Sequence, residues 1–486
     1  MAETKTVIEP LILVGDCLEY LRDIDDDSID AIITDPPYGL EFMGKDWDRP
    51  WAVTPSAAVG FEGREGNLTL PSHRDSRNAN CRACGGRQRG AKRCECPSPK
   101  WDRSPADDMR AFQEWCTAWT TECLRVLKPG GHLLAFGGTR TWHRLACAVE
   151  DAGFEVRDSI AWLYGSGFPK SLDVSKAIDK AAGAQREVTG QSWAGKTGRT
   201  ALGQGSGWNV TANPESHDIT APATPDAERW QGWGTALKPA FEPIVVARKP
   251  LSGTVAANVL RHGTGALNID LCRVTADGPR PAPATSQGER EATRIGESSA
   301  DRRYTDKGGT NFAPLPGVRG GNPAGRWPTN VVLDDSQAEV LDEQSGRPGF
   351  SGGGTKGAGL RAEYVGGERR DTDLPATTYG DTGGASRFFP TFRYQAKAPK
   401  RERPVIERED GTRTAHPTVK PLELMRWLVR LVTPPGGIVL DPFAGSGTTV
   451  EAGMLEGFEV WAIEREADYL PLIQVRIDRV MAEAHE

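Results

Sequence analysis

The chain has 486 residues, enough for two or three domains, and a formal net charge of -7. No stretch reaches the roughly 18 apolar residues of a membrane helix, and Glu3 and Glu9 do not fit a signal peptide, so we expect a cytoplasmic protein without membrane contact. The charge argues against a DNA-coating protein. Basic clusters at residues 82–93, 302–303 and 393–403 are either a local DNA-binding surface or solvated loop charge.

The first predicted elements are a strand over residues 11–16 and a helix over residues 17–24. Asp16 stands between them, where a helix cap is its simplest role. The three acids at residues 25–27 predict a solvated turn.

Residues 29–34 form an apolar run that predicts a buried parallel strand, ended by Asp35, Pro36, Pro37 and Tyr38. The acid therefore lies at the carboxyl end of a strand, where open α/β sheets bind ligands. A carboxylate and a rigid backbone carbonyl there can accept both N–H bonds of an exocyclic amine on adenine or cytosine. An aromatic ring beside them can stack on an extruded base. Taken alone, the tetrad fits a strand-ending turn equally well.

The next residues, 40–100, are rich in Gly, Pro and Arg and predict an insertion beside the site. Four thiols lie close together within it, at Cys81, Cys84, Cys94 and Cys96. In a cytosolic protein so dense a group predicts tetrahedral zinc rather than disulfides, although the Cys-x-Cys half is tighter than usual.

A strand and helix alternation follows over residues 101–182 and continues the sheet. It comprises a helix at 107–127, a strand at 132–136, a helix at 139–152, a strand at 154–162 and a helix at 174–182. The aromatic residues that recur along the first of these helices predict core packing. Residues 184–233 predict a polar loop, and residues 237–247 predict a strand that adds to the sheet.

A second motif follows a strand near the end of the chain: Asp441, Pro442, Phe443, Ala444, Gly445, Ser446, Gly447 and Thr448. Its small residues allow a ligand to approach the backbone closely, and a helix at 449–456 presents free N–H groups. A phosphate-binding loop would need Lys where Gly447 stands, so an adenosyl cofactor is favoured. Glu464 ends the next strand, where an acid can accept hydrogen bonds from ribose hydroxyls.

The two motifs together resemble the S-adenosylmethionine-dependent amino-methylating DNA methyltransferases, the N6-adenine/N4-cytosine family. Because the Asp35 tetrad precedes the glycine-rich loop, the order resembles the permuted β group, including its phage-type members. The resemblance implies an α/β fold, a Rossmann-like methyltransferase sheet with helices on both faces, circularly permuted motif order and loop-rich insertions. It also implies cofactor contacts by Asp16 and the adjacent Cys17, and by Thr418 and Lys420 ahead of a helix at 422–432.

This resemblance divides the chain into functional regions. They are a catalytic half (1–39), the insertion with the zinc knuckle (40–100), the remainder of the catalytic sheet (101–182), a loop-rich target-recognition region (183–395) and a cofactor-binding half (396–486).

The resulting hypothesis is a site-specific methyltransferase that acts on a flipped base in double-stranded DNA. Asp35 at the first tetrad position favours adenine N6, with cytosine N4 as the alternative. A non-catalytic DNA-binding module of the same fold is a second hypothesis. Cytosine-C5 chemistry is disfavoured because the chain has no Pro-Cys pair. A homodimer and a cognate restriction endonuclease are left open as partners.

Overall fold

The computed structural model describes residues 8–39, 105–165, 167, 171–192, 217–274, 325–345, 384–392, 403–407, 411 and 413–485. The chain separates into two compact units, residues 1–163 with 242–486, and residues 164–241. Across the described ranges, no helix combines the length and the apolar composition needed to span a bilayer.

The larger unit is built on one nine-stranded sheet with the order β1-β13-β12-β2-β3-β7-β4-β8-β9. The strands are β1 (Leu11–Val14), β2 (Ile29–Thr34), β3 (Leu127–Phe136), β4 (Glu155–Leu163), β7 (Phe241–Arg248), β8 (Val331–Asp334), β9 (Thr391–Phe392), β12 (Ile438–Asp441) and β13 (Glu459–Glu464). The strands from β1 to β3 in this order pair in parallel, whereas β7 runs antiparallel to β3. Every residue of β2 is buried, as predicted for a central parallel strand.

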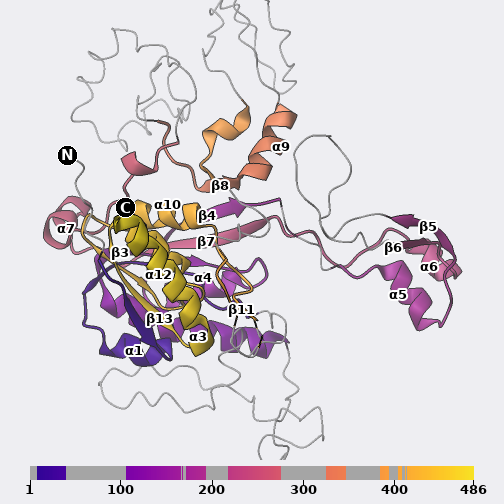
Figure 1. Ribbon diagram of the computed structural model, residues 1–486, viewed down its shortest axis with the longest axis horizontal. Coiled ribbons are helices and arrows are strands. Elements are labelled where there is room, and N and C mark those ends of the chain that lie inside the picture. Colours follow the sequence, from indigo (N-terminus) through magenta and orange to yellow (C-terminus); the bar gives the residue numbers. More distant parts are fainter. Residues whose placement is uncertain are drawn as a thin grey trace, which may run out of the picture. The chain divides into compact units, whose positions relative to one another are not determined.

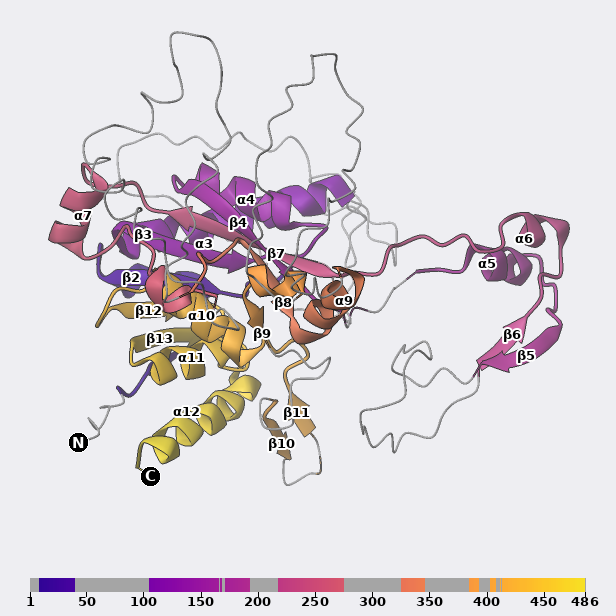
Figure 2. The same cartoon turned by 90° about the horizontal axis from the view of Figure 1, so that it is seen from above.

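Helices cover both faces of this sheet (Figures 1 and 2). One face carries α1 (Cys17–Asp23), α3 (Pro105–Val126) and α4 (Trp142–Asp151), and the other carries α10 (Leu422–Val432), α11 (Thr448–Glu456) and α12 (Leu470–His485). Leu21, Trp119 and Leu145 pack with the sheet on the first face. Val450 and Ile473 pack with it on the second. The predicted α/β class with helices on both faces is confirmed.

The described part of residues 183–395 contributes more order than its composition predicts. Its residues supply β7, β8 and β9 to the main sheet, and also α7 (Val255–His262), α9 (Asp335–Ser345) and 3-10 turns at Asp270–Cys272 and Ala385–Phe388. A hairpin of β10 (Val405–Glu407) and β11 (Arg413–Ala415) precedes α10, and a 3-10 turn at Ala467–Tyr469 precedes α12.

The smaller unit, residues 164–241, contains α5 (Val174–Ala181), β5 (Val188–Ser192), β6 (His217–Thr220) and α6 (Pro225–Arg229). The prediction of a loop over residues 184–233 is therefore wrong for its described part. Buried Asp179 organises this unit, because its carboxylate accepts from Arg186 at 2.6 Å, from Thr224 at 2.7 Å and from the Ala223 amide at 3.0 Å. A single buried acid of α5 thus holds the segment before β5 and the start of α6, an arrangement that the polar sequence pattern does not reveal.

Strand β3 begins earlier than predicted. Residues 128–131 were expected to separate a helix from a strand beginning at His132, but β3 already begins at Leu127. A register shift in its pairing with β2, between Ile29 and Ala31, accommodates the extra residues. The Asp30 carboxylate ties this end down, because it accepts from Lys128 at 2.7 Å and from the Ile438 amide at 2.9 Å.

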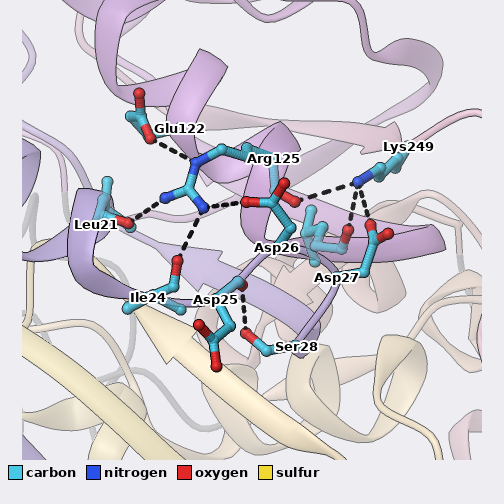
Figure 3. A network of polar contacts seen from close by, with 10 residues as sticks. Leu21, Ile24, Asp25, Asp26, Asp27, Ser28, Glu122, Arg125 and Lys249 are labelled. Atoms are coloured by element: carbon cyan, nitrogen blue, oxygen red, sulfur yellow. Dashed lines mark hydrogen bonds and ion pairs between the residues drawn. The ribbon is translucent and has the colours of Figure 1, made fainter.

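The acidic turn before β2 is more than a solvated loop (Figure 3). Asp26 is paired with Arg125 at 2.5 Å, and Asp27 is paired with Lys249 at 2.6 Å. Arg125 also pairs with Glu122, so one guanidinium fastens the turn to α3. The two acids are exposed, as predicted, but they fix the entry of the central strand.

Candidate active site

The two sequence motifs meet at the centre of the sheet. Strands β2 and β12 are parallel neighbours, so the Asp35 tetrad and the Asp441 loop leave the same edge of the sheet side by side. The buried Thr34 hydroxyl donates to the Asp441 carboxylate at 2.6 Å and joins the two strand ends directly. From here β12 leads through α11 to β13, whereas β2 leads through α3 to β3 on its other side. This reversal of direction is the switch point at which open α/β sheets bind ligands.

A cavity of about 390 Å³ opens at this point. Its walls contain the whole tetrad, Asp16, Cys17, Thr418, Lys420, Glu464 and the loop residues from Asp441 to Ser446 together with Thr448. Among the described catalytic and cofactor-binding residues predicted from the sequence, only Gly447 does not line the cavity. Gly447 stands at the amino end of α11, directly behind the cavity wall.

The tetrad is fixed on both its side chains and its backbone. Asp35 Oδ1 accepts from the Tyr38 hydroxyl at 2.8 Å, and Asp35 Oδ2 accepts from Lys420 Nζ at 2.5 Å. The Thr141 hydroxyl donates to the Tyr38 carbonyl at 2.7 Å and so ties the turn to the start of α4. Both oxygens of the predicted catalytic carboxylate therefore have donors within the protein.

Lys420 is the charged centre of this group. Its ammonium lies 3.2 Å from the Tyr38 hydroxyl, 3.5 Å from Glu242 and 4.8 Å from the centroid of the Phe136 ring. Burial lowers the pKa of Lys420, but Asp35 and Glu242 outweigh that effect and leave the pKa above its usual range. Burial raises the pKa of Glu242, against the opposing effect of Lys420. Lys420 is thus a cation shared by two carboxylates.

The glycine-rich loop is bound to the second acid of the site. Glu464 accepts from the Gly445 amide at 2.6 Å through Oε2 and from the Glu466 amide at 2.7 Å through Oε1. Asp441 accepts from the Phe443 amide at 3.0 Å. Burial raises the pKa of Asp441 to about 6 and that of Glu464 to about 7. The cavity therefore contains two carboxylates whose ionisation is opposed by their surroundings.

Two glycines shape this loop. Gly445 and Gly447 have φ angles of 54° and 79°, a region that disfavours other residues. A Cβ on Gly445 would lie 3.1 Å from His416 Nε2, and one on Gly447 would lie 3.1 Å from the Cα of Ile473. The sequence requires glycine here for both backbone conformation and space.

The C-terminal helix α12 supports the loop from behind. Arg476 is fully buried and donates from Nε to the Ser446 carbonyl at 2.8 Å. Arg476 also pairs with Glu451 of α11, to which Arg479 donates at 2.9 Å. A buried guanidinium thus holds a loop carbonyl in a fixed direction.

An aromatic wall closes one side of the cavity. Trp115 and Phe443 have ring centroids 5.5 Å apart, and Trp119 lies 5.3 Å from Phe443. Trp119 is core, as predicted, but Trp115 lines the cavity. Trp115 thus packs against the core, as predicted, and also lines the cavity, which the sequence did not indicate, because α3 passes directly behind the loop that carries Phe443.

Sequence reasoning missed several residues of the cavity wall: Trp162, Glu242, Arg403, His416, Glu466 and Tyr469. Glu242 is the most informative of them. It stands at the amino end of β7, and because β7 runs antiparallel to β3, that end reaches the edge where β2 and β12 end. The sequence could have indicated Glu242 only by showing that β7 runs antiparallel to β3. A Glu-Pro pair carries no information about strand direction.

Asp16 has the predicted helix-cap role and also lies in the cavity wall. Its Oδ1 accepts from the Leu18 amide at 2.9 Å and caps α1.

The cavity wall as a whole is rich in acids. It contains six carboxylates, at Asp16, Asp35, Glu242, Asp441, Glu464 and Glu466, and three basic side chains, at Arg403, Lys420 and Arg465. Such a surface favours a cationic ligand over a phosphate.

The predicted zinc ligands Cys81, Cys84, Cys94 and Cys96 lie outside the described residues. No group of His, Cys, Asp or Glu arranged for a metal ion occurs within the described ranges. The zinc prediction is therefore untested, and metal analysis of a chelator-free preparation would refute it at less than about one equivalent. Of the three basic clusters, the described part includes only Arg403.

Comparison with known families decides the assignment. The family described as DNA methylase, which groups the N6 and N4 enzymes, matches residues 29–475. This chain belongs to that DNA methylase family. The match contains both motifs of the cavity, the Asp35 tetrad and the Asp441 loop.

Two curated relatives are type II methyltransferases from Haemophilus influenzae. M.HindIII, from strain ATCC 51907 / DSM 11121 / KW20 / Rd, is 25% identical over 257 residues, which cover 52% of this chain and 63% of that protein. M.HinfI is 25% identical over 151 residues, which cover 31% of this chain and 30% of that protein. The chain thus spans less than two thirds of the length of either relative.

Solved structures also align with this chain over nearly its whole length. TTHA0409 from Thermus thermophilus, complexed with S-adenosyl-L-methionine, has a TM-score of 0.35 at 14% identity and covers 97% of this chain and 94% of its own. The cytosine-N4-specific PvuII DNA methyltransferase has a TM-score of 0.37 at 11% identity, and the alignment covers 99% of this chain and 93% of that protein. The fold class follows from the nine-stranded sheet and its two helical layers.

Proposed function

We propose that this protein is a DNA methyltransferase. It transfers a methyl group from S-adenosylmethionine to the exocyclic amine of a base turned out of double-stranded DNA, with adenine N6 as the first candidate. One observation carries the proposal: the Asp35 tetrad and the Asp441 loop, more than 400 residues apart, line a single cavity. Membership of the DNA methylase family supports it.

The tetrad side of the cavity matches the needs of a weakly nucleophilic amine. The lone pair of an exocyclic amine is delocalised into the ring, so attack requires the nitrogen to become tetrahedral. We assign Asp35 and the Pro36 carbonyl, which both belong to the cavity wall, as the acceptors of its two N–H bonds; accepting both bonds would favour that change and orient the lone pair. Tyr38 offers an aromatic face on which an extruded base can stack.

The loop side of the cavity matches an adenosyl donor with a positive charge. Gly445 allows close approach to the backbone, and Glu464 is a buried carboxylate of the kind that accepts from ribose hydroxyls. The excess of carboxylates in the wall favours a sulfonium cation and disfavours a triphosphate. When bound, S-adenosylmethionine would supply the electrophilic methyl group.

Two residues ahead of α10 are proposed to reach the donor's carboxylate. Thr418 lines the cavity, and its carbonyl lies 2.7 Å from His416 Nδ1. Lys420 is held by Asp35 and Glu242 here, so contact with the donor requires its ammonium to be shared three ways or to turn. Thr418 is therefore the simpler of the two assignments.

Adenine N6 is proposed over cytosine N4 because an acid stands at the first tetrad position. Cytosine N4 remains the alternative, since it would present the same kind of amine to Asp35.

We further propose that residues 183–395 contribute to target recognition. A homodimer would be tested by light scattering, and a restriction partner by co-expression and cleavage of unmodified DNA.

The test is to incubate the purified chain with isotopically labelled S-adenosylmethionine and unmethylated DNA, and to analyse the nucleosides by mass spectrometry. We expect labelled N6-methyladenine. Labelled N4-methylcytosine would retain the reaction and change the base. A protein that binds the donor but labels no DNA nucleoside would be the non-catalytic module, and this outcome overturns the proposal.

Competing substrates and sequence context complete this experiment. RNA and protein added to the same reaction should remain unlabelled while DNA is available. Sequencing DNA from a methylation-free host that expresses the chain should show a fixed sequence around each modified base.

A further inference from the structure

We infer that Glu242 is a positioning residue for methyl transfer, a reserve acceptor that receives the hydrogen bonds now made to Asp35 when the target amine arrives. This inference rests on the proposed function. It assigns a role to the amino end of β7, a strand that contributes to neither sequence motif.

The argument starts from how fully Asp35 is occupied. Its Oδ1 accepts from the Tyr38 hydroxyl at 2.8 Å, and its Oδ2 accepts from Lys420 at 2.5 Å. A base amine that donates to the same carboxylate must compete with both donors. The site therefore needs either spare lone pairs in good geometry or somewhere else for the two donors to go.

Glu242 offers that place to both donors. Its Oε2 lies 3.2 Å from the Tyr38 hydroxyl and 3.5 Å from Lys420 Nζ. A phenol has one proton to donate, so Tyr38 can satisfy one of the two carboxylates at a time. Turning that proton from Asp35 to Glu242 exchanges one acceptor for another without leaving a partly buried donor unpaired, which would be unfavourable.

The charges of Asp35, Glu242 and Lys420 support the same role for Glu242. Two carboxylates share the single ammonium of Lys420, so Glu242 limits how strongly Lys420 neutralises Asp35. A neutral residue at position 242 would leave Lys420 paired with Asp35 alone. Asp35 would then be the poorer acceptor for the base amine, because its charge would be more completely compensated.

The fold explains why this acceptor comes from β7. β7 pairs with β3 through Ile244↔Phe136, which places Glu242 just beyond the carboxyl end of β3. Phe136 lies 4.8 Å from the Lys420 ammonium and forms a wall beneath it. The ammonium thus lies between two acids, 2.5 Å from Asp35 and 3.5 Å from Glu242, with the Phe136 and Tyr38 rings beside it, so a small rotation brings it to either acid.

The test is a double-mutant cycle with steady-state kinetics on DNA. Glu242→Met keeps the side-chain length and removes the acceptor. We expect it to lower kcat/KM by at least about tenfold, or ~1.4 kcal/mol, while the dissociation constant for S-adenosylmethionine changes by less than about threefold. Glu242→Asp should recover part of the loss. A Tyr38→Phe background has no phenol that needs a second acceptor, and only the effect of Glu242 on Lys420 remains, so Glu242→Met should cost clearly less there than in the wild type.

The control is Glu155→Gln, which breaks the ion pair between Glu155 and Arg248 at the other end of β7 and should leave kinetics unchanged. An equal loss from Glu242→Met in both backgrounds, or no loss in either, overturns the inference. If Glu242→Met fails to bind the donor, the isosteric Glu242→Gln replaces it in the same cycle. It should lower kcat/KM by a smaller factor than expected for Glu242→Met, and again by less in the Tyr38→Phe background. An inactive wild type would instead contradict the proposed function, so the two failures are distinguishable.

Discussion

At the scale of single residues, Asp35 is the proposed acceptor for the base amine, and the cavity holds it through both carboxylate oxygens. It follows a fully buried strand, and its carboxylate is aligned by a phenol and an ammonium from elements far apart in the chain. Removing it should leave the donor half of the cavity intact, because the loop and Glu464 are held by separate hydrogen bonds.

Asp35→Ala is accordingly expected to abolish methyl transfer to DNA while S-adenosylmethionine still binds within about threefold of the wild-type affinity. Product formation by mass spectrometry and donor binding by calorimetry would measure the two effects. Asp23→Ala, an exposed acid at the end of α1, serves as the matched control and should behave as wild type. Full activity in Asp35→Ala would remove this residue from the mechanism.

The raised pKa values of Asp441 and Glu464, from 3.8 to about 6 and from 4.5 to about 7, predict a pH dependence of stability. The folded state retains these protons at pH values where the unfolded state has lost them. The free energy of unfolding therefore falls as the pH rises from about 4 to about 7, by about 1.4 kcal/mol for each tenfold difference in proton affinity between the folded and unfolded states.

Urea unfolding at pH 5 and pH 8 tests this dependence. We expect the unliganded wild type to lose more stability between these two pH values than Glu464→Gln loses, because the variant has no proton to release at that position. Parallel losses in the two proteins would show that Glu464 titrates normally. The same ionisation that costs stability provides a negative site for a cationic donor.

At the scale of elements, helix α11 is bounded by two glycines that differ in one respect. Gly447 and Gly457 both have left-handed φ angles, 79° and 81°. A Cβ on Gly447 would press against the backbone of α12, whereas a Cβ on Gly457 would meet nothing within 4 Å. This pair separates the cost of backbone conformation from the cost of crowding at the cavity.

Gly457→Ala should lower the free energy of unfolding by about 1–2 kcal/mol through backbone strain and leave donor affinity unchanged. Gly447→Ala should lower it further and weaken donor binding by about tenfold or more, or ~1.4 kcal/mol. Chemical denaturation and calorimetry would measure the two quantities. Equal effects of the two substitutions on donor binding would argue that α12 does not shape the loop.

At the scale of the whole molecule, the cavity belongs to a single unit of the chain. None of its wall residues lies between residues 164 and 241, the range that forms the smaller unit. The two ends of that range are adjacent, because the Tyr164 amide donates to the Ala240 carbonyl at 2.9 Å. The smaller unit can therefore be removed without stretching the chain.

Replacing residues 166–238 by a short Gly-Ser linker should give a folded protein that binds S-adenosylmethionine within about threefold of the wild-type affinity. A thermal unfolding transition and calorimetry would establish both properties. Loss of donor binding by a folded variant would show that the unit supports the cavity. Methylation of DNA by the same variant would report whether these residues contribute to target recognition.

Sequence reasoning succeeded where local pattern and local chemistry coincide. The apolar run of β2 and the prolines after it placed Asp35 at a strand end, and the small residues of the loop marked Gly445, which lines the cavity, and Gly447, which lies directly behind its wall. Both signals depend on backbone conformation and burial over a few residues. It failed for the described part of residues 184–233, because two short antiparallel strands and a five-residue helix have no sustained hydrophobic period.

The sequence by itself determined the fold class, the family resemblance and nearly all residues of the two motifs, because each of these is written in contiguous residues. The tertiary structure alone decided how the motifs meet and what completes them. Glu242, Trp115 and Arg476 reach the cavity or its loop only through strand direction and helix packing. Those properties arise from contacts between residues hundreds of positions apart, which no local pattern specifies.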